Sequence, residues 1–434
     1  PASRGEYERV FHVDMRLFWS AVSVMVLLLC AIMAMTINSY LTRETQLAAN
    51  ESLTAAREPR RFSASEALPS VSLVSDVDRQ LRAAFEDAIP RFGSVVYRSD
   101  RAVTVDHPLA DFYIQTVPTG ERSLNVQFFH RESGILIGAD QIPAGVNDPL
   151  LADQVSRILS RFLPVGGVIY AFLESDGRLN PLTRCMSLTA AYFNEQTAER
   201  HLAAYRCHED LMKDGVKSAL VYSDMAGLTV ETITDGYEYP TEASLVTAVT
   251  MARRAVELAP NLAQAHRALG WALQVSGEHL AALDQIREAH ALNHYDLSIA
   301  ASYGNTLVAV GDFTSAVNVL ERATKASPVH PTWWDYSLFL AAFQNGRDDL
   351  ISVSARNLVG RERSHYCAAR LIAAYLEGDD AMRTKMLAEI SSRDNAFLRD
   401  PLEFYSRAMP PDAARKLVRA LGDAGLKSAN TNDG

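Results

Sequence analysis

The chain has 434 residues, of which 48% are apolar and 22% charged, with a formal net charge of −10 and a pI near 5.6. This length and apolar content are enough for more than one compact unit with a buried core. The acidic balance excludes a nucleic-acid-binding surface, which needs clustered Lys and Arg.

The first predicted element is a membrane-spanning helix. Residues 17–37, LFWSAVSVMVLLLCAIMAMTI, include no charged side chain. At about 1.5 Å per residue, such a run crosses the ~30 Å hydrocarbon layer of a bilayer. The alternative is a cleaved signal peptide, whose apolar run is shorter, about 7–15 residues, and ends in a small-x-small site. Here the run continues into Asn38-Ser39-Tyr40, and we therefore predict a retained transmembrane helix over residues 17–37.

The orientation of this helix follows from the arginines around it. Three arginines lie before the apolar run and two lie shortly after it: Arg4, Arg9 and Arg16, then Arg43 and Arg57. The positive-inside bias places the stub 1–16 in the cytoplasm. We thus expect a single-pass protein of the inner (cytoplasmic) membrane, with a juxtamembrane linker over residues 38–68 and the bulk of the chain in the periplasm.

Residues 69–173 have the pattern of a small α/β domain. The run DRQLRAAFEDAIPRF and residues 149–162 each place their apolar side chains on one helical face. Between them lie short strand-like runs, such as LNVQFF with its alternating Leu124, Val126 and Phe128, separated by turns with Gly and polar residues. We predict one open sheet with helices on a single face.

Residues 182–425 are predicted to form helix pairs that repeat. The stretch from His266 matches the stretch from Ala300 at a shift of 34 residues, the period of tetratricopeptide (TPR) repeats. Gly270 and Gly304 then fall where the two helices of a pair cross, and the next glycine of each repeat, Gly277 or Gly311, falls at the turn. The same register extends both ways and indicates five to six pairs, followed by a disordered tail over residues 426–434. The fold class is therefore α+β: a transmembrane helix, a small α/β domain and an all-α TPR solenoid.

Two cysteines are candidates for a disulfide. With a helical turn near residues 194–197, Cys185 and Cys207 lie at the same level of two antiparallel helices, within reach of each other in an oxidising compartment. Two independent buried thiols are the alternative.

The inner surface of the repeats is the candidate site. The first helix of each TPR lines the concave face, where aromatic and polar side chains grip an extended peptide. The alternative for the aromatic residues is packing between repeats. The predicted protein-binding residues are Arg267, Trp271, Asn305, Trp333, Tyr336, Leu340 and Phe343.

The sequence offers no motif of an enzyme or a metal site. It has no CxxC or HExxH spacing for zinc, no GxSxG elbow and no phosphate-binding GxxxxGK[ST] loop. We therefore predict no catalytic residue, no metal and no cofactor, and expect that the protein is not an enzyme.

The order of a membrane span, a small α/β unit and a TPR array resembles a known arrangement. It is similar to the sensory half of CadC-like membrane regulators and of TPR-bearing adenylate-cyclase-type proteins of proteobacteria. The resemblance rests on ADFYIQTVPTGERSLNVQFFHRESGILIGADQIP, LLADQVSRILSRFLPVGGVIYA and ALVYSDMAGLTVE together with the repeats. It implies that the α/β unit is like the N-terminal domain of TolB and that the exported part is sensory. Those relatives carry a winged-helix or cyclase domain before the span, where this chain has only 16 residues.

Three functions follow as hypotheses. The first is a membrane-anchored periplasmic TPR scaffold or adaptor that binds another protein in an envelope complex. The second is the sensory portion of a transmembrane regulator or cyclase whose cytoplasmic output domain is absent from this chain. The third is an accessory subunit that packs through its span against other membrane proteins.

Overall fold

The computed structural model describes residues 67–74, 79–99, 109–120, 123–143, 148–358, 363–392 and 396–427. The predicted transmembrane helix 17–37, the stub before it and the linker up to residue 66 lie outside these ranges, as do residues 428–434 of the predicted tail. Within the described ranges, no helix has both the length and the apolar character that a membrane crossing requires.

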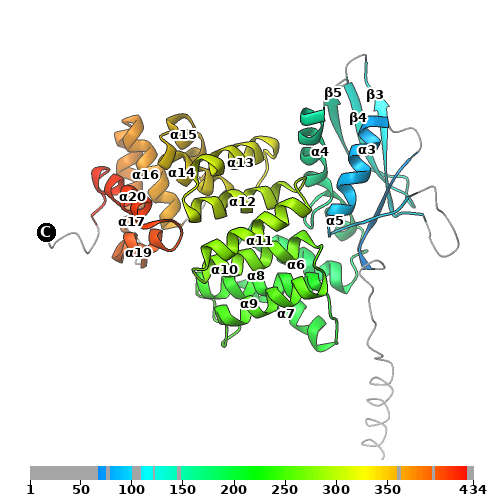
Figure 1. Ribbon diagram of the computed structural model, residues 1–434, viewed down its shortest axis with the longest axis horizontal. Helices are drawn as coiled ribbons and strands as arrows, with labels where there is room; N and C mark the ends of the chain where they lie inside the picture. Colours follow the sequence, from blue (N-terminus) through cyan, green and yellow to red (C-terminus); the bar gives the residue numbers. More distant parts are fainter. Residues whose placement is uncertain are drawn as a thin grey trace, which may run out of the picture. The chain divides into compact units, whose positions relative to one another are not determined.

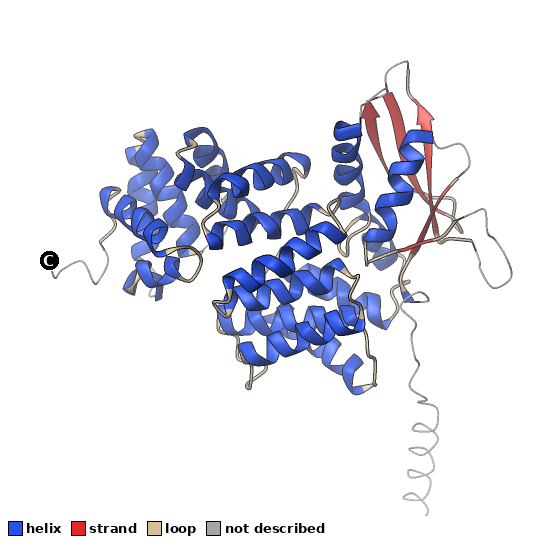
Figure 2. Ribbon diagram, in the orientation of Figure 1, coloured by secondary structure: helices blue, strands red, loops and turns tan. Residues whose placement is uncertain are grey.

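The N-terminal part of the described chain is a five-stranded mixed sheet (Figures 1 and 2). The strand order is β2-β1-β3-β4-β5, in which β1 is parallel to β2 and β3, whereas β4 is antiparallel to both of its neighbours. The strands are β1 (Ser70–Leu73), β2 (Val96–Tyr97), β3 (Phe112–Pro118), β4 (Ser123–His130) and β5 (Leu136–Pro143).

Two amphipathic helices, α3 (Arg79–Ala88) and α4 (Asp148–Phe162), share one core with the strands, and the short α5 (Val168–Ser175) joins them. Strand alternation decides which side chains enter this core: Val126 and Phe128 of β4 are fully buried, and the ring of Phe128 stacks on Phe162 of α4 at 3.8 Å. The sheet and the helices on one of its faces agree with the predicted α/β unit.

The remaining described chain is helical. Six consecutive pairs are present in the described ranges: α6 (Pro181–Asn194) with α7 (Ala198–Lys213), α8 (Ala219–Asp235) with α9 (Leu245–Leu258), α10 (Ala263–Val275) with α11 (His279–Leu292), α12 (Leu297–Val310) with α13 (Phe313–Ala326), α14 (Thr332–Asn345) with α15 (Asp348–Asn357), and α16 (Ser364–Glu377) with α17 (Asp380–Ser391). Three further helices end the chain: α18 (Ala396–Arg399), α19 (Pro401–Ser406) and α20 (Pro411–Asp423).

The glycines of the repeats are where the sequence places them. A Cβ added to Gly270 would lie 2.5 Å from Ile286, and one added to Gly304 would lie 2.4 Å from Leu320, so only glycine lets the two helices of a pair approach this closely. Gly311 ends α12 with φ of 86°, in the left-handed region. The consecutive helix pairs, with starts 34 residues apart for α10 and α12, make this region a TPR array.

We expect Gly304→Ala to lower the free energy of unfolding by about 1–3 kcal/mol, because the new methyl group overpacks the contact with Leu320. Urea unfolding measures the change. Gly422 in α20 is the matched control, since a Cβ there meets nothing within 4 Å. Gly422→Ala should leave the stability unchanged or raise it by up to about 1 kcal/mol. Equal losses in both variants would contradict the assigned role of Gly304.

The α/β unit and the repeats form one body through the turn between α11 and α12, a contact that the sequence does not predict. Tyr295 of this turn lies in the core of the α/β unit, and its hydroxyl donates to Asp87 Oδ2 at 2.9 Å. Ser160 Oγ of α4 donates to the Tyr295 carbonyl oxygen at 3.0 Å and accepts from Leu297 N at 3.0 Å. The turn between α11 and α12 therefore packs against helices α3 and α4 of the α/β unit.

Removal of only the hydroxyl, in Tyr295→Phe, should lower the free energy of unfolding by about 1 kcal/mol, because Asp87 loses a hydrogen-bond donor while the ring stays packed. Chemical denaturation of the full chain measures the difference. Tyr375→Phe is the control, since this tyrosine is 38% exposed on α16. An unchanged midpoint for Tyr295→Phe would show that the bond contributes nothing to the docking of the α/β unit.

Candidate protein-binding face of the helical repeats

The first helices of successive pairs pack side by side: α10 contacts both α8 and α12, and α12 contacts α14. Polar side chains join α10 to α12 and α12 to α14. Arg267 Nη1 donates to Ser298 Oγ at 2.9 Å, Thr306 Oγ1 donates to Gln274 Oε1 at 2.8 Å, and Ser337 Oγ donates to Asn305 Oδ1 at 3.0 Å. These bonds hold the half-buried Arg267 and Asn305 in set orientations on the face.

Trp271 lies on α10, one helical turn after Arg267. Its ring lies 5.9 Å from that of Phe193 in α6, and a Cβ on Gly227 of α8 would lie 3.2 Å from it. The side chain is half-buried, so one part of the indole packs between helices and another part reaches the surface. The packing between helices that the sequence offers as the alternative is therefore present for Trp271, and its role in binding stays a prediction.

The structure corrects the expectation for the distal residues. Leu340 and Phe343 of α14 are only 2% and 8% exposed and belong to the core, and the half-buried Trp333 and Tyr336 pack against that core. The reason is that the C-terminal helices cover α14 and α16. Repeat periodicity identifies the face that these residues share, but it contains no signal for the chain segment that covers the face.

Three contacts define this cover. Lys416 Nζ lies 5.1 Å above the Phe343 ring, Gln344 Nε2 donates to the Ala413 carbonyl oxygen at 2.9 Å, and the ring of Phe404 lies 5.3 Å from that of His365. On the first helices α10 and α12, by contrast, Arg267, Trp271 and Asn305 are half-buried.

A group of carboxyl and tyrosine side chains lies next to this surface, and we name Tyr192, Glu231, Asp235 and Tyr237 the carboxyl cluster. The Tyr192 hydroxyl donates to Glu231 Oε2 at 2.8 Å, and the Tyr237 hydroxyl donates to Asp235 Oδ2 at 3.2 Å. Arg363, the residue before α16, donates from Nη2 to Asp235 Oδ2 at 3.0 Å. Arg363, at the start of the sixth helix pair, thus contacts the last residue of α8 in the second pair.

Burial changes the acidity of this cluster. Glu231 is 7% exposed, and its burial, followed by the charge of Asp235, raises the pKa of the Glu231 carboxyl to about 8. Burial, with the nearby Glu231 charge, also raises the pKa of the Tyr192 hydroxyl well above its ordinary value. At neutral pH the Glu231 carboxyl is therefore held mainly as the neutral acid.

The sequence analysis missed the carboxyl cluster. Its only local signal is Glu231 and Asp235 at a spacing of four on one helix, which is the spacing of side chains on one face. Nothing in the sequence pairs Asp235 with Arg363, which lies 128 positions away.

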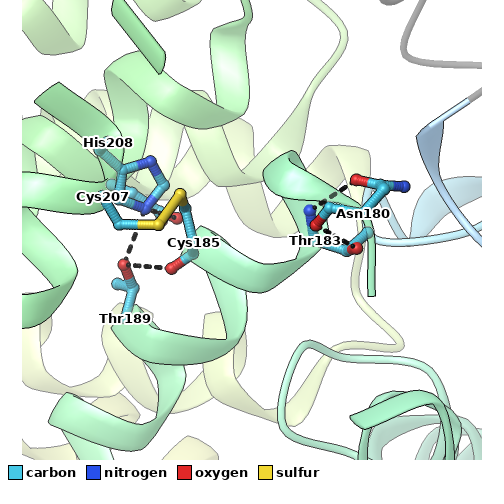
Figure 3. Close-up of a disulfide and its surroundings, with 7 residues drawn as sticks. Asn180, Thr183, Cys185, Thr189, Cys207 and His208 are labelled. Atoms are coloured by element: carbon cyan, nitrogen blue, oxygen red, sulfur yellow. Dashed lines mark hydrogen bonds and ion pairs between the residues drawn. A yellow bond between two sulfur atoms is a disulfide. The ribbon is translucent and has the colours of Figure 1, made fainter. Parts of the chain in front are cut away.

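The predicted disulfide is present. Cys185 of α6 and Cys207 of α7 are bonded, with their Cα atoms 5.3 Å apart (Figure 3). Thr189, one turn after Cys185, has its Oγ1 2.9 Å from His208 Nε2, so a buried polar bond runs beside the disulfide. Cys367 is a buried thiol outside this disulfide, and its Sγ donates to Glu389 Oε2 at 3.6 Å.

A polar hollow of about 400 Å³ lies beside the sheet. Arg131 is held at its wall by bonds from Nε to the Ala110 carbonyl oxygen and from Nη2 to Ser72 Oγ, both 2.8 Å, while Arg178 pairs with Glu132. The hollow is lined by Ala67, Leu68, Pro69, Leu109, Ala110, Asp111, His130, Arg131, Glu132, Leu173, Arg178, Asn180 and Thr183. No group of three potential metal ligands occurs among the residues for which positions are described.

Comparison with protein-family models finds none that matches, and a search among curated proteins finds no match either. Solved structures do match. PilF of Pseudomonas aeruginosa is 17% identical, with a TM-score of 0.33 over 46% of this chain and 88% of that one. YrrB, a TPR protein with an unusual peptide-binding site, is 14% identical, with a TM-score of 0.29 over 43% and 91%. A TPR protein from Parabacteroides merdae is 8% identical, with a TM-score of 0.33 over 62% and 99%.

At identities and TM-scores this low, the repeat assignment rests on the helix pairs, the period and the glycine contacts of the chain itself.

Proposed function

We propose that the protein is a membrane-anchored TPR scaffold that binds another protein of an envelope complex through the inner face of α10 and α12. The observation that carries this proposal is that Arg267 and Asn305 are each oriented by a bond to the next first helix and stay half-buried, as does Trp271, one helical turn after Arg267. Such side chains supply register through their polar groups and affinity through their aromatic ring. No catalytic step is part of the proposal.

The anchor and the compartment are further parts of this proposal. The uncharged run 17–37 and the arginines before it support a single-pass inner-membrane protein with a cytoplasmic N-terminus and a periplasmic bulk. The Cys185–Cys207 disulfide is consistent with an oxidising compartment. Protease added outside spheroplasts tests the orientation: it should degrade the bulk of the chain, and full protection would refute the periplasmic placement.

Site-specific photo-crosslinking tests the binding face. A photoreactive amino acid at Asn305, on α12, is expected to capture a discrete partner in native membranes. The matched control is Glu288, an exposed residue of α11 on the second helix of its pair. Equal yields at both positions, or none at Asn305, would overturn the assignment of the inner face.

The sensory portion of a transmembrane regulator is the second candidate, and the polar hollow favours it. Ala67 and Leu68, the last two residues of the predicted linker to the membrane, line the hollow together with Pro69, so a ligand there would contact the segment that leads to the anchor. The DNA sequence immediately upstream of this coding region distinguishes the two functions. An in-frame winged-helix or cyclase domain supports the regulator, and a start codon immediately before this chain supports the scaffold.

A further inference from the structure

Arg363 joins helix pairs that are far apart in the sequence. Its guanidinium donates to Gln196 Oε1 at 2.8 Å and to Asp235 Oδ2 at 3.0 Å, residues that precede it by 167 and 128 positions. Gln196 belongs to the turn between α6 and α7, and Asp235 is the last residue of α8. Both acceptors are therefore supplied by the first two pairs, and the donor by the sixth.

The surroundings of the guanidinium are built to hold these two acceptors in place. Gln196 directs its amide oxygen to Arg363 because its Nε2 donates to Glu231 Oε2 at 3.2 Å. Asp235 is fixed by the Tyr237 hydroxyl. Both bonds leave one nitrogen, Nη2, and the planarity of the guanidinium fixes the directions of its two N–H groups toward the two oxygens.

The cluster is continuous with the proposed binding face. Trp271 contacts Phe193, the neighbour of Tyr192, and Gly227, which lies one helical turn before Glu231. The contact is also partly open to solvent, since the side chains of Arg363 and Asp235 are 34% and 18% exposed. Arg363 can thus leave the cluster without unfolding of the helices that form it.

We propose that the carboxyl cluster, together with Gln196, is a subsite for an arginine side chain of the bound partner, and that Arg363 occupies this subsite in the free protein. The partner's guanidinium replaces that of Arg363 and keeps the same two acceptors. That the arginine belongs to a bound polypeptide rests on the proposed function. That the subsite accepts a guanidinium rests on the position of Arg363.

Ethylguanidinium is the probe, because it reproduces the end of an arginine side chain. In the full-length protein, Arg363→Ala vacates the subsite and leaves its acceptors in place. Calorimetric titration at millimolar ethylguanidinium should then show one site per chain in Arg363→Ala. We expect binding to be ~10-fold or more weaker in wild type, where Arg363 competes, and in Arg363→Ala/Asp235→Asn, which lacks the charged acceptor.

The matched control is Arg347→Ala. Arg347 also pairs with an aspartate, Asp349 at 2.8 Å, but this pair is on the surface and within one turn of chain. This variant should bind ethylguanidinium no better than wild type. Equal binding of ethylguanidinium by all variants would show only non-specific association and would overturn the proposal. A folded Arg363→Ala variant that binds no ethylguanidinium would also overturn it.

If Arg363→Ala does not fold, Arg363→Lys replaces it. The shorter cation leaves room beside Gln196, so ethylguanidinium should bind this variant more tightly than wild type, and absence of that difference overturns the proposal. Because these titrations need no partner, their failure is distinguishable from failure of the crosslink at Asn305, which tests the proposed function.

Discussion

Glu231→Gln is expected to raise the free energy of unfolding at pH 8 by roughly 2–4 kcal/mol. In the folded protein the pKa of Glu231 is raised from 4.5 to about 8, mainly by burial. Glutamine has the shape of the protonated acid, and its amide oxygen can accept from the Tyr192 hydroxyl and from Gln196 as the carboxyl does. The substitution therefore removes the cost of a buried ionisable group and keeps its hydrogen bonds.

The sign of the pH dependence follows from proton counts. Below about pH 4.5, Glu231 is protonated in both states and contributes nothing to the pH dependence. Between about pH 4.5 and 8 the unfolded chain releases this proton while the folded protein keeps it, so the free energy of unfolding falls as pH rises, and above about pH 8 this contribution is constant. In Glu231→Gln the falling segment should disappear.

Urea denaturation between pH 5 and 8.5 measures this slope. The groups that face Glu231 are Tyr192 and Gln196 from the first pair, Asp235 and Tyr237 at the end of α8, and Arg363. The control is Glu257→Gln, because Glu257 on α9 is exposed and pairs only with Arg254 in the bonds that the structure describes for it. An unaltered slope in Glu231→Gln would contradict the burial argument.

Loss of the disulfide should have a comparable effect. We expect Cys185→Ala/Cys207→Ala to lower the free energy of unfolding by about 3 kcal/mol, because the bond closes a loop of 22 residues and restricts the unfolded chain. The first helix pair carries Tyr192 and Gln196, so its loosening should also increase hydrogen exchange at the carboxyl cluster.

Unfolding with and without a reductant checks this prediction. Reduced wild type should match the double variant, which itself should not respond to the reductant. Cys367→Ala is the control: it removes a buried thiol but should keep the full response, since Cys367 is not part of the disulfide. A reductant response of the same size in the double variant would show that the effect has another source.

The local elements of this protein could be predicted from the sequence because each depends on residues close together in the chain. The 34-residue recurrence of Gly270 and Gly304 predicts the helix crossings, and the structure places Ile286 and Leu320 at those two positions. The disulfide was predictable for the same reason, because one short turn brings Cys185 and Cys207 to the same level.

The candidate site was predicted in part. Arg267, Trp271 and Asn305 lie on the first helices of their pairs, as the repeat register requires, and are half-buried. Leu340 and Phe343 have the same register but are buried, because α20 packs on the end of α14. The non-periodic C-terminal segment contains no pattern that states where it packs.

By itself, therefore, the sequence determined the helix pairs, their crossings and turns, the alternating strands of the α/β unit and the cysteine pair, all through short-range periodicity and spacing. Only the tertiary structure decided which part of the inner face is open, that Tyr295 docks the α/β unit on the array, and that Arg363 meets Asp235. These contacts join residues that are 69, 208 and 128 positions apart, and they depend on how stacked pairs curve in space, which no local pattern of side chains specifies.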